Sequence, residues 1–178
     1  YWLASPLRRL VQKPEWVLSG MVNNGMTVLD IGPGMGFFTL PMARMVGREG
    51  KVIAAEVQEG MLKALRRRAG KAGLGARVTP HLCRKDSLAL EEFQGKVDFA
   101  LAFAVLHEMP DVTGCFRQLA ATLKPGAFTL IAEPKGHTSL EQFEKMLTAA
   151  EKARLFQVER PKLFGCYVAL LEKDKAAS

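Results

Sequence analysis

The residues best suited to chemistry gather first around a glycine-rich stretch, Asp30-Ile31-Gly32-Pro33-Gly34-Met35-Gly36, which follows a short apolar run. Glycine tolerates positive φ and has no Cβ, so the backbone there can approach a ligand closely. A helix expected just after the stretch offers unpaired N–H groups at its N-terminus. Twenty residues after the stretch, Glu56 ends a second apolar run, where a carboxylate can accept both hydroxyls of a ribose. These residues predict a site for a nucleoside-bearing cofactor.

The spacing of the three glycines separates two classes of cofactor. A dinucleotide fingerprint reads G-x-G-x-x-G and requires glycine at position 37, which is Phe here. The third glycine comes one residue earlier, and Asp30 lies two residues before the first. The Asp30 carboxylate would repel a pyrophosphate, but it suits a ligand that carries an ammonium and a sulfonium group. The stretch therefore favours S-adenosylmethionine over NAD.

His107 and Glu108 are candidates for proton transfer, because they follow a strongly apolar run. An imidazole titrates near neutral pH and can act as a base. Neighbouring residues on an extended segment point apart, so pairing these two side chains requires a turn, for which Met109-Pro110 gives a reason. The alternative, in which His107 only shapes a pocket, stays open. Three further candidates for contacting a substrate follow the next apolar run: Glu133, which can equally be a structural cap, Lys135 and His137.

Strand and helix signals alternate along the whole chain. Apolar and β-branched runs predict strands at 26–31, 51–56, 76–83, 97–103, 127–133, 155–163 and 166–173. Amphipathic stretches predict helices at 37–47, 58–73, 111–126 and 139–153, the third closed by Pro125-Gly126. Ser139 is the expected N-cap of the fourth helix, with Gln142 at the capping-box position. A leading helix interrupted at Pro14 is expected before the first strand.

This alternation predicts an α/β fold, a doubly wound Rossmann-like sandwich with a seven-stranded, mostly parallel sheet whose last strand is antiparallel. The short link at Phe164-Gly165 favours a hairpin between the last two strands. We expect a single domain over 1–178, with a leading helical segment at 1–24 and a cofactor-binding core at 25–178. Ligands of such sheets bind at the carboxyl edge of the strands, where all the candidate residues fall.

The composition excludes several other classes. The chain has 178 residues, nearly half of them apolar, and no run approaches the ~18 apolar residues of a membrane span. The N-terminal residues lack the apolar stretch of a secretory signal. Cys83, Cys115 and Cys166 lie far apart and without metal-ligand spacing, so we expect reduced thiols, no metal and a cytoplasmic protein.

The net charge of +7 is concentrated in one part of the chain. Residues 44–85 hold eleven Lys and Arg and three Glu, an excess larger than that of the whole chain. Such a basic face can attract phosphates, as in nucleic-acid binding. No aromatic side chains interleave with the charges as in a reader of single strands. A solvated helix face therefore remains the favoured interpretation.

The motifs in their order resemble the class I S-adenosylmethionine-dependent methyltransferases, in particular the small UbiE-like and arsenite-methyltransferase-like branch. The resemblance extends from about Pro14 to Lys173. Five segments carry it: VLDIGPGMG at 28–36, VIAAE at 52–56, CRKDSLAL at 83–90, VDFALAFAVLHEMPD at 97–111 and LKPGAFTLIAEP at 123–134. Each segment is weak alone, but five in the expected order and spacing are specific.

The resemblance implies a set of residues that bind S-adenosylmethionine and release S-adenosylhomocysteine. Asp30, Gly32, Gly34 and Gly36 would frame the methionine part, and Glu56 would hold the ribose hydroxyls. The residues expected around the adenine are Val57, Met61, Asp86 and Ser87. The remaining expected contacts from the resemblance are those of Ala102 and Phe103 near the methionine part. From their residue type, Phe37, Phe103 and the leading Trp16 are candidates to pack around the sulfonium or the acceptor, although aromatic residues at such positions are more often part of a core.

The function implied is methyl transfer from S-adenosylmethionine to a small-molecule acceptor. Two alternatives remain open. One is an RNA methyltransferase that uses the basic 44–85 face, which is disfavoured because that face belongs to the second and third strands rather than to the methyl end. The other is a cofactor-binding module without enzymatic activity.

Overall fold

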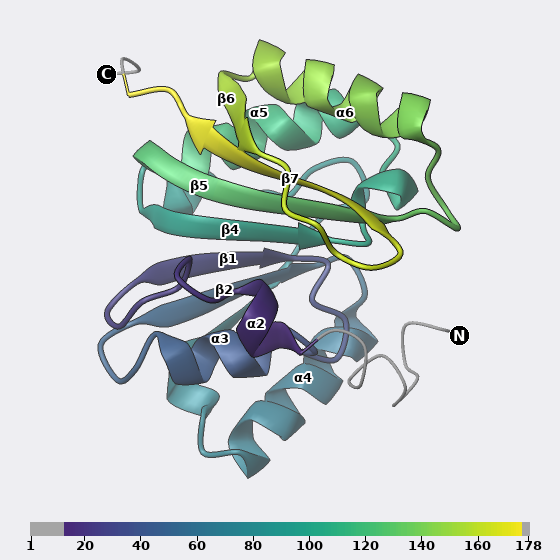
Figure 1. The fold of residues 1–178 in the computed structure, drawn as a ribbon. Coiled ribbons are helices and arrows are strands. Elements are labelled where there is room, and N and C mark those ends of the chain that lie inside the picture. The colour runs from purple at the N-terminus through teal and green to yellow at the C-terminus, as the bar shows by residue number, and fades with distance from the viewer. Residues whose placement is uncertain (1–12, 176–178) are drawn as a thin grey trace.

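The computed structural model describes residues 13–175, and their strands form one seven-stranded sheet in the order β3-β2-β1-β4-β5-β7-β6 (Figure 1). The strands are β1 (Thr27–Ile31), β2 (Lys51–Glu56), β3 (Val78–Leu82), β4 (Val97–Phe103), β5 (Leu123–Pro134), β6 (Leu155–Glu159) and β7 (Cys166–Lys173). The α-helices are α2 (Pro14–Val17), α3 (Thr39–Met45), α4 (Glu59–Lys71), α5 (Val112–Thr122) and α6 (Leu140–Lys152). Short 3₁₀ turns are η2 (Gly75–Arg77), η3 (Glu91–Phe93) and η4 (Leu106–Glu108).

The sheet is parallel except at β7. Strands β1 to β5 pair in parallel, and β7 runs antiparallel to both β5 and β6. This arrangement confirms the predicted doubly wound α/β sandwich with an antiparallel last strand. The carboxyl ends of β1 and β4 point to the right in Figure 1, so the loops that follow the parallel strands share that edge.

Helices cover the sheet on both faces (Figure 1). One apolar core lies between the sheet and α3 and α4, with Leu40, Met42 and Leu65 among its members. The other lies between the sheet and α5 and α6, with Phe116 and Phe143 among its members. The central strands are buried on both sides, as parallel strands between two helical layers must be. Within residues 13–175, no helix is long and apolar enough to cross a membrane.

Helix α6 begins as predicted. The Ser139 side chain accepts from the backbone N–H of Gln142, and the Gln142 side chain accepts from the N–H of Ser139, which completes a capping box. Helix α5 begins at its N-cap Asp111, whose side chain accepts from the N–H of Gly114.

Several predicted boundaries are wrong, and those of three elements differ in ways that matter for the fold. Pro125-Gly126 does not close a helix: α5 ends at Thr122, and both residues lie inside β5. The pairing of β4 with β5 shifts register there, which accommodates a proline that donates no hydrogen bond. Helix α3 is shorter than 37–47, and β6 ends at Glu159, so six residues rather than Phe164-Gly165 alone join it to β7.

The described part of the leading segment begins with α2. Pro14 occupies the first turn of this helix, where a missing N–H costs nothing. The part of the predicted leading helix before Lys13 lies outside the described residues.

Candidate active site

A cleft of about 550 Å³ lies at the carboxyl edge, walled by the loops that follow β1, β2, β3 and β4. Of the residues named from the sequence as cofactor-binding, those that line the cleft are Asp30, Gly32, Gly34, Phe37, Glu56, Val57, Met61, Asp86, Ser87 and Phe103. Gly36 and Ala102, also named from the sequence, are not among the residues that line the cleft. Folding therefore brings together residues from four separate segments of the sequence.

The glycine-rich loop needs its glycines for different reasons. Gly32, Gly34 and Gly36 all have positive φ, at 68°, 52° and 89°. A Cβ on Gly32 would lie 2.5 Å from Val105 Cγ2, and a Cβ on Gly36 would overlap the side chain of Leu65. A Cβ on Gly34 would meet no atom within 4 Å. Gly32 and Gly36 thus allow the chain to pack, whereas Gly34 leaves open backbone facing the cleft.

Two acids hold this part of the site. Asp30 is buried, and its carboxylate accepts from the hydroxyl of Thr39 at 2.5 Å. Glu56 Oε1 accepts from the N–H groups of Val57 and Gln58, at 2.9 and 3.0 Å. Glu56 Oε2 accepts from the N–H of Gly34 at 3.2 Å, which ties the end of β2 to the glycine-rich loop. Glu56 therefore lies at the edge of the cleft with its carboxylate oriented by backbone.

The loop after β3 is held by Gln118, which the sequence did not single out. Gln118 Oε1 accepts from Ser87 Oγ at 2.7 Å, from the N–H of Leu88 at 2.9 Å and from the N–H of Ala89 at 3.3 Å. The N–H of Ser87 itself donates over 3.4 Å to the carbonyl of Arg84, a long hydrogen bond. Gln118 comes from α5, and no local sequence signal connects it with a loop about thirty residues away.

Two thiols lie beneath this loop. Cys83 and Cys115 are buried, and both line the cleft. Burial raises the pKa of Cys83 to about 12, assisted by the charge of Glu56. Burial likewise raises the pKa of Cys115 to about 12, assisted by Cys83 and Asp111. Both sulfur atoms are therefore held as neutral thiols.

Aromatic rings and an arginine border the other end of the glycine-rich loop. The ring of Phe38 packs edge-on against that of Phe37, with the ring centroids 5.0 Å apart. It also packs at a tilt against the ring of Phe103, with the centroids 4.6 Å apart. Arg68 reaches over from α4, and its Nη1 donates to the carbonyl of Met35 at 2.6 Å. Both Phe37 and Phe103 line the cleft.

A buried carboxylate organises the loop after β4. Glu133, at the end of β5, is fully buried. Its Oε1 accepts from the N–H groups of Val105 and Leu106, at 3.1 and 2.8 Å. Its Oε2 accepts from His107 Nδ1 and, over 3.5 Å, from Thr138 Oγ1. The available sequence signal is that Glu133 ends an apolar strand, as Glu56 does.

The same network places His107. Its Nδ1 is bound by Glu133, while Glu108 Oε1 lies 3.8 Å from Nε2, so the firm partner of the imidazole is Glu133. The ring stacks on that of His137, with centroids 5.3 Å apart. Glu108 lines the cleft, whereas His107 lines a second cavity. The sequence candidates after β4 and β5 thus meet, but in a pairing different from the one expected.

The basic segment lies on the β2–β3 side of the molecule, where α4 packs against both strands. The exposed basic residues of α4 are Lys63, Arg66, Arg67 and Lys71. Arg68, Arg84 and Lys85 extend this charge to the wall of the cleft. No three His, Cys, Asp or Glu among the described residues are grouped so that they could hold a metal.

Comparison with protein families gives one match over most of the chain. Residues 22–174 match the family described as methyltransferase domain. The curated relatives include a ubiquinone/menaquinone biosynthesis C-methyltransferase UbiE of Idiomarina loihiensis, 33% identical over 112 residues. The UbiE of an Escherichia coli strain is 30% identical over 112 residues. Each match covers 63% of this chain but 44% of the relative, so the chain spans less than half the length of these relatives.

Solved structures share the whole fold. An S-adenosylmethionine-dependent methyltransferase from Aquifex aeolicus superposes with a TM-score of 0.84 at 27% identity, covering 96% of this chain and 95% of that one. The [4+2]-cyclase SpnF superposes with a TM-score of 0.74 at 17% identity, covering 90% of this chain and 80% of that one, a likeness of fold alone. The chain therefore belongs to the methyltransferase family, among the class I S-adenosylmethionine-dependent enzymes.

Proposed function

We propose that this protein transfers a methyl group from S-adenosylmethionine to a small-molecule acceptor bound in the cleft. The observation that carries the proposal is the pairing of Glu56 with Gly34. A carboxylate oriented by backbone lies 3.2 Å from the N–H of a glycine that leaves open space beside it. A ribose with a neighbouring amino-acid tail matches this combination of acceptor and open backbone.

The residues present fit the adenosine part of this cofactor. Glu56 would accept the ribose hydroxyls. Val57 is apolar yet 53% exposed at the cleft, and Met61 lies one helical turn further on, so the two can flank an adenine. Asp86 and Ser87 would meet the edge of the base. Desolvation of Val57 by a bound ring would contribute to affinity.

At the other end, the cofactor supplies a methyl group on a positively charged sulfonium. Phe37 and Phe103 present aromatic faces, which attract cations, and Phe38 holds both rings in place. Asp30 supplies negative charge for the ammonium group. Gly36 and Ala102 would support this region from behind. The contribution of the chain is placement: an acceptor held in line with the methyl gains rate by orientation alone.

His107 and Glu108 remain candidates for the general base. Glu133 binds His107 Nδ1 and leaves Nε2 as the nitrogen able to accept a proton. Glu108 lines the cleft, so of the two it lies nearer to an acceptor bound there. If His107 is the base, His107→Ala should lower turnover about 10²–10⁴-fold and remove a pH dependence near neutrality. If it only shapes a pocket, the acceptor's KM should rise with kcat unchanged.

The acceptor class rests on two observations. The UbiE relatives are named C-methyltransferases of quinone biosynthesis, which supports a small organic acceptor. The cleft wall near the aromatic rings is apolar, with Met35, Val105, Met109 and Pro110. An RNA acceptor is the alternative, and binding to the basic face would then fall steeply with salt.

Two measurements test the proposal. S-adenosylhomocysteine should raise the melting temperature of the protein, and NAD should not; the opposite result would reject the cofactor. Tritiated S-adenosylmethionine should then label the metabolite fraction of a cell extract rather than its RNA or protein. Label in RNA would move the function to the alternative, and tight cofactor binding without any labelled fraction would indicate a module without activity.

A further inference from the structure

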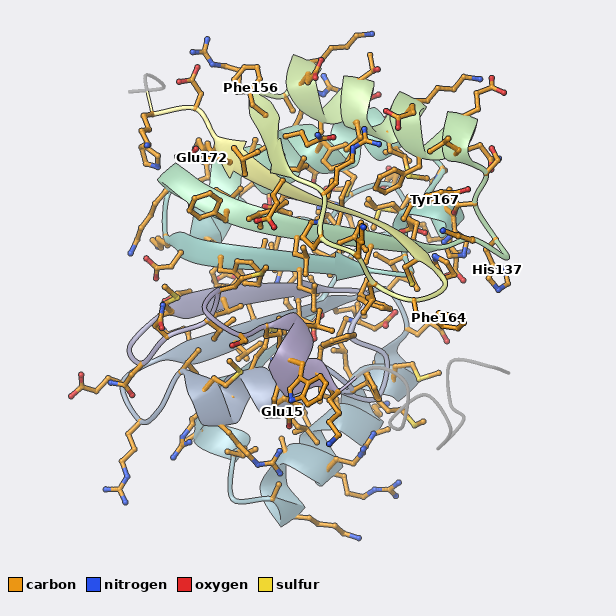
Figure 2. The ribbon with its side chains drawn as sticks, viewed as in Figure 1. Glu15, His137, Phe156, Phe164, Tyr167 and Glu172 are labelled. Atoms are coloured by element: carbon orange, nitrogen blue, oxygen red, sulfur yellow. The ribbon has the colours of Figure 1, made fainter. Side chains whose placement is uncertain are left out.

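A second cavity, of about 360 Å³, lies between η4, the first turn of α5 and α6. Met109 lines both this cavity and the cleft, so a single side chain separates them. Apart from His107, a candidate base, the proposed methyl transfer uses no residue that lines this cavity alone. In Figure 2, His137 marks its surroundings at the right-hand side, where the chain passes from β5 toward α6.

The walls of the second cavity are mostly apolar. Met109 and Val112 form one side, and Met146 and Ala149 of α6 form the other. Methionine side chains adapt to ligands of differing shape. The volume falls within the range of cavities that hold small organic ligands. The body of an occupant would therefore be a compact apolar group.

Three polar groups of the cavity carry or can acquire positive charge. They are the imidazoles of His107 and His137, which stack at 5.3 Å with their planes 19° apart, and the ammonium of Lys145; Thr113 and Gln142 are neutral polar residues of the same lining. Because Nδ1 of His107 is engaged by the buried Glu133, Nε2 is the nitrogen left for another partner. Glu108 lies too far from Nε2 for a normal hydrogen bond, and its side chain is 63% exposed.

We infer that the second cavity binds a small carboxylate with an apolar body. The body would lie against Met146 and Ala149, and the carboxylate would lie between His107 Nε2 and Lys145 Nζ. On binding, Nε2 takes up one proton from solvent. The imidazolium then lies between two carboxylates, that of the ligand and that of Glu133, as in other strong charge-assisted pairs.

The charges around His107 permit this exchange of partners. The titratable groups that face its ring are Glu133, Glu108 and His137, and Lys145 faces the cavity from α6. Lys145 pairs with Glu141 on the surface at 2.7 Å, with both side chains more than 70% exposed. Such exposed pairs contribute little, so a ligand carboxylate can replace Glu141. At His107 Nε2, the acid that competes with the ligand is Glu108, whose Oε1 lies 3.8 Å away.

Methionine methyl groups offer a direct readout. With ¹³C-methyl methionine, Met146 reports the second cavity, Met35 and Met61 report the cleft, and the buried Met42 serves as reference. Phenylacetate should shift the Met146 resonance saturably, with half-saturation at about 1 mM or below. Its neutral isostere phenylacetamide should not shift it. The methyl resonances of Met35 and Met61 should not shift.

Charge variants test the anchor. Lys145→Glu should weaken phenylacetate binding at least about tenfold, because it reverses one of the two positive charges between which the carboxylate would lie. Lys152→Glu makes the same change on the same helix but outside the cavity, and should leave binding unchanged. Glu108→Gln should tighten binding about threefold, because it removes the competing carboxylate.

Three outcomes would overturn the inference: no saturable shift of Met146 up to about 10 mM phenylacetate, equal shifts with phenylacetamide, or full binding by Lys145→Glu. The same sample separates this result from the proposed function. S-adenosylhomocysteine should shift Met35 and Met61, so failure of the cofactor proposal appears at those resonances and failure of the second site at Met146.

Discussion

The two halves of the carboxyl edge use the same residue type for opposite purposes. In the half formed by β1 to β3, Glu56 ends its strand at the edge of the cleft and bonds to the open Gly34. In the half formed by β4 and β5, Glu133 ends its strand fully buried and bonds inward to a loop. Both acids accept from backbone N–H groups, but Glu56 also lines the cleft, whereas Glu133 is fully buried and does not line it. We therefore expect Glu56 to meet a ligand and Glu133 to hold the loop.

The energetic expectation differs accordingly. Removing a carboxylate that faces a cleft leaves N–H groups that water can reach. Removing a buried one leaves donors that nothing else can satisfy, at about 1–3 kcal/mol for each group. Substitutions in the first half should therefore change mainly ligand affinity, and substitutions in the second half should change mainly the free energy of unfolding.

The largest expected effect concerns two glycines of the first half. Gly34→Val should abolish binding of S-adenosylhomocysteine in a folded protein, because its side chain enters open space in the cleft. Gly36→Val places the same side chain at a similarly positive φ, but against Leu65, and should destabilise the fold instead. Calorimetric titration and urea unfolding of both variants measure the contrast. Normal affinity for S-adenosylhomocysteine in a folded Gly34→Val variant would contradict this contrast between the two glycines.

Glu133→Gln tests the second half. An amide keeps one acceptor oxygen but replaces the other with donors that face His107, so the free energy of unfolding should fall by about 2–4 kcal/mol. Thr138→Val is the matched control, because it removes only the 3.5 Å contact to the same carboxylate. Urea unfolding measures both. Equal losses in the two variants would show that Glu133 does not organise the loop.

Glu56→Ala should give the reverse profile. Affinity for S-adenosylhomocysteine should fall by roughly 1–3 kcal/mol, while the free energy of unfolding changes by less than about 1 kcal/mol. The N–H groups of Val57 and Gln58 then turn to water. If Glu56→Ala lowered the free energy of unfolding as much as Glu133→Gln does, the two acids would not differ in their contribution to stability.

A smaller effect is expected at Gln118, which lines the cleft and supports the loop after β3. Gln118→Leu removes the oxygen that accepts from Ser87, Leu88 and Ala89, and should weaken S-adenosylhomocysteine about tenfold. Gln118→Glu keeps an oxygen at that place and should recover most of the affinity. If the Glu variant binds as weakly as the Leu variant, the loop is not held through this oxygen.

The smallest effect concerns alkaline stability. The folded-state pKa of Cys115 lies near 12, above the ordinary value of 9.0, so between these pH values the folded chain keeps a proton that the unfolded chain releases. Stability should therefore fall as pH rises above 9. Cys115→Ala should remove about 1 kcal/mol of this loss between pH 8 and 10, measured by urea unfolding. If the unmodified protein and Cys115→Ala lost the same free energy of unfolding between pH 8 and 10, the raised pKa of Cys115 would be contradicted.

The sequence was informative where structure is local. The glycine spacing and Glu56 lie within about thirty residues, and a strand–loop–helix–strand unit brings them together without reference to the rest of the chain. The seven strands were predicted because their apolar runs are long and clearly bounded. The capping box at Ser139 was predicted because it depends on four consecutive residues.

The sequence was uninformative where contacts depend on strand pairing. His107 and Glu133 are 26 residues apart and meet only because β4 pairs with β5. Gln118 reaches Ser87 through the packing of α5. The Pro125-Gly126 pair has the local signature of a helix end, but pairing with β4 extends the strand through it. In each case a long-range contact outweighed the local signal.

The neutral thiols beneath the cleft have a consequence for selectivity between nucleophiles. A sulfonium methyl donor alkylates any reactive nucleophile within reach, and a thiolate is among the most reactive in proteins. With pKa values near 12, Cys83 and Cys115 are deprotonated in only about one molecule in 10⁵ at pH 7. For the cofactor proposed above, burial thus protects the enzyme from methylating itself and keeps the methyl group for its acceptor.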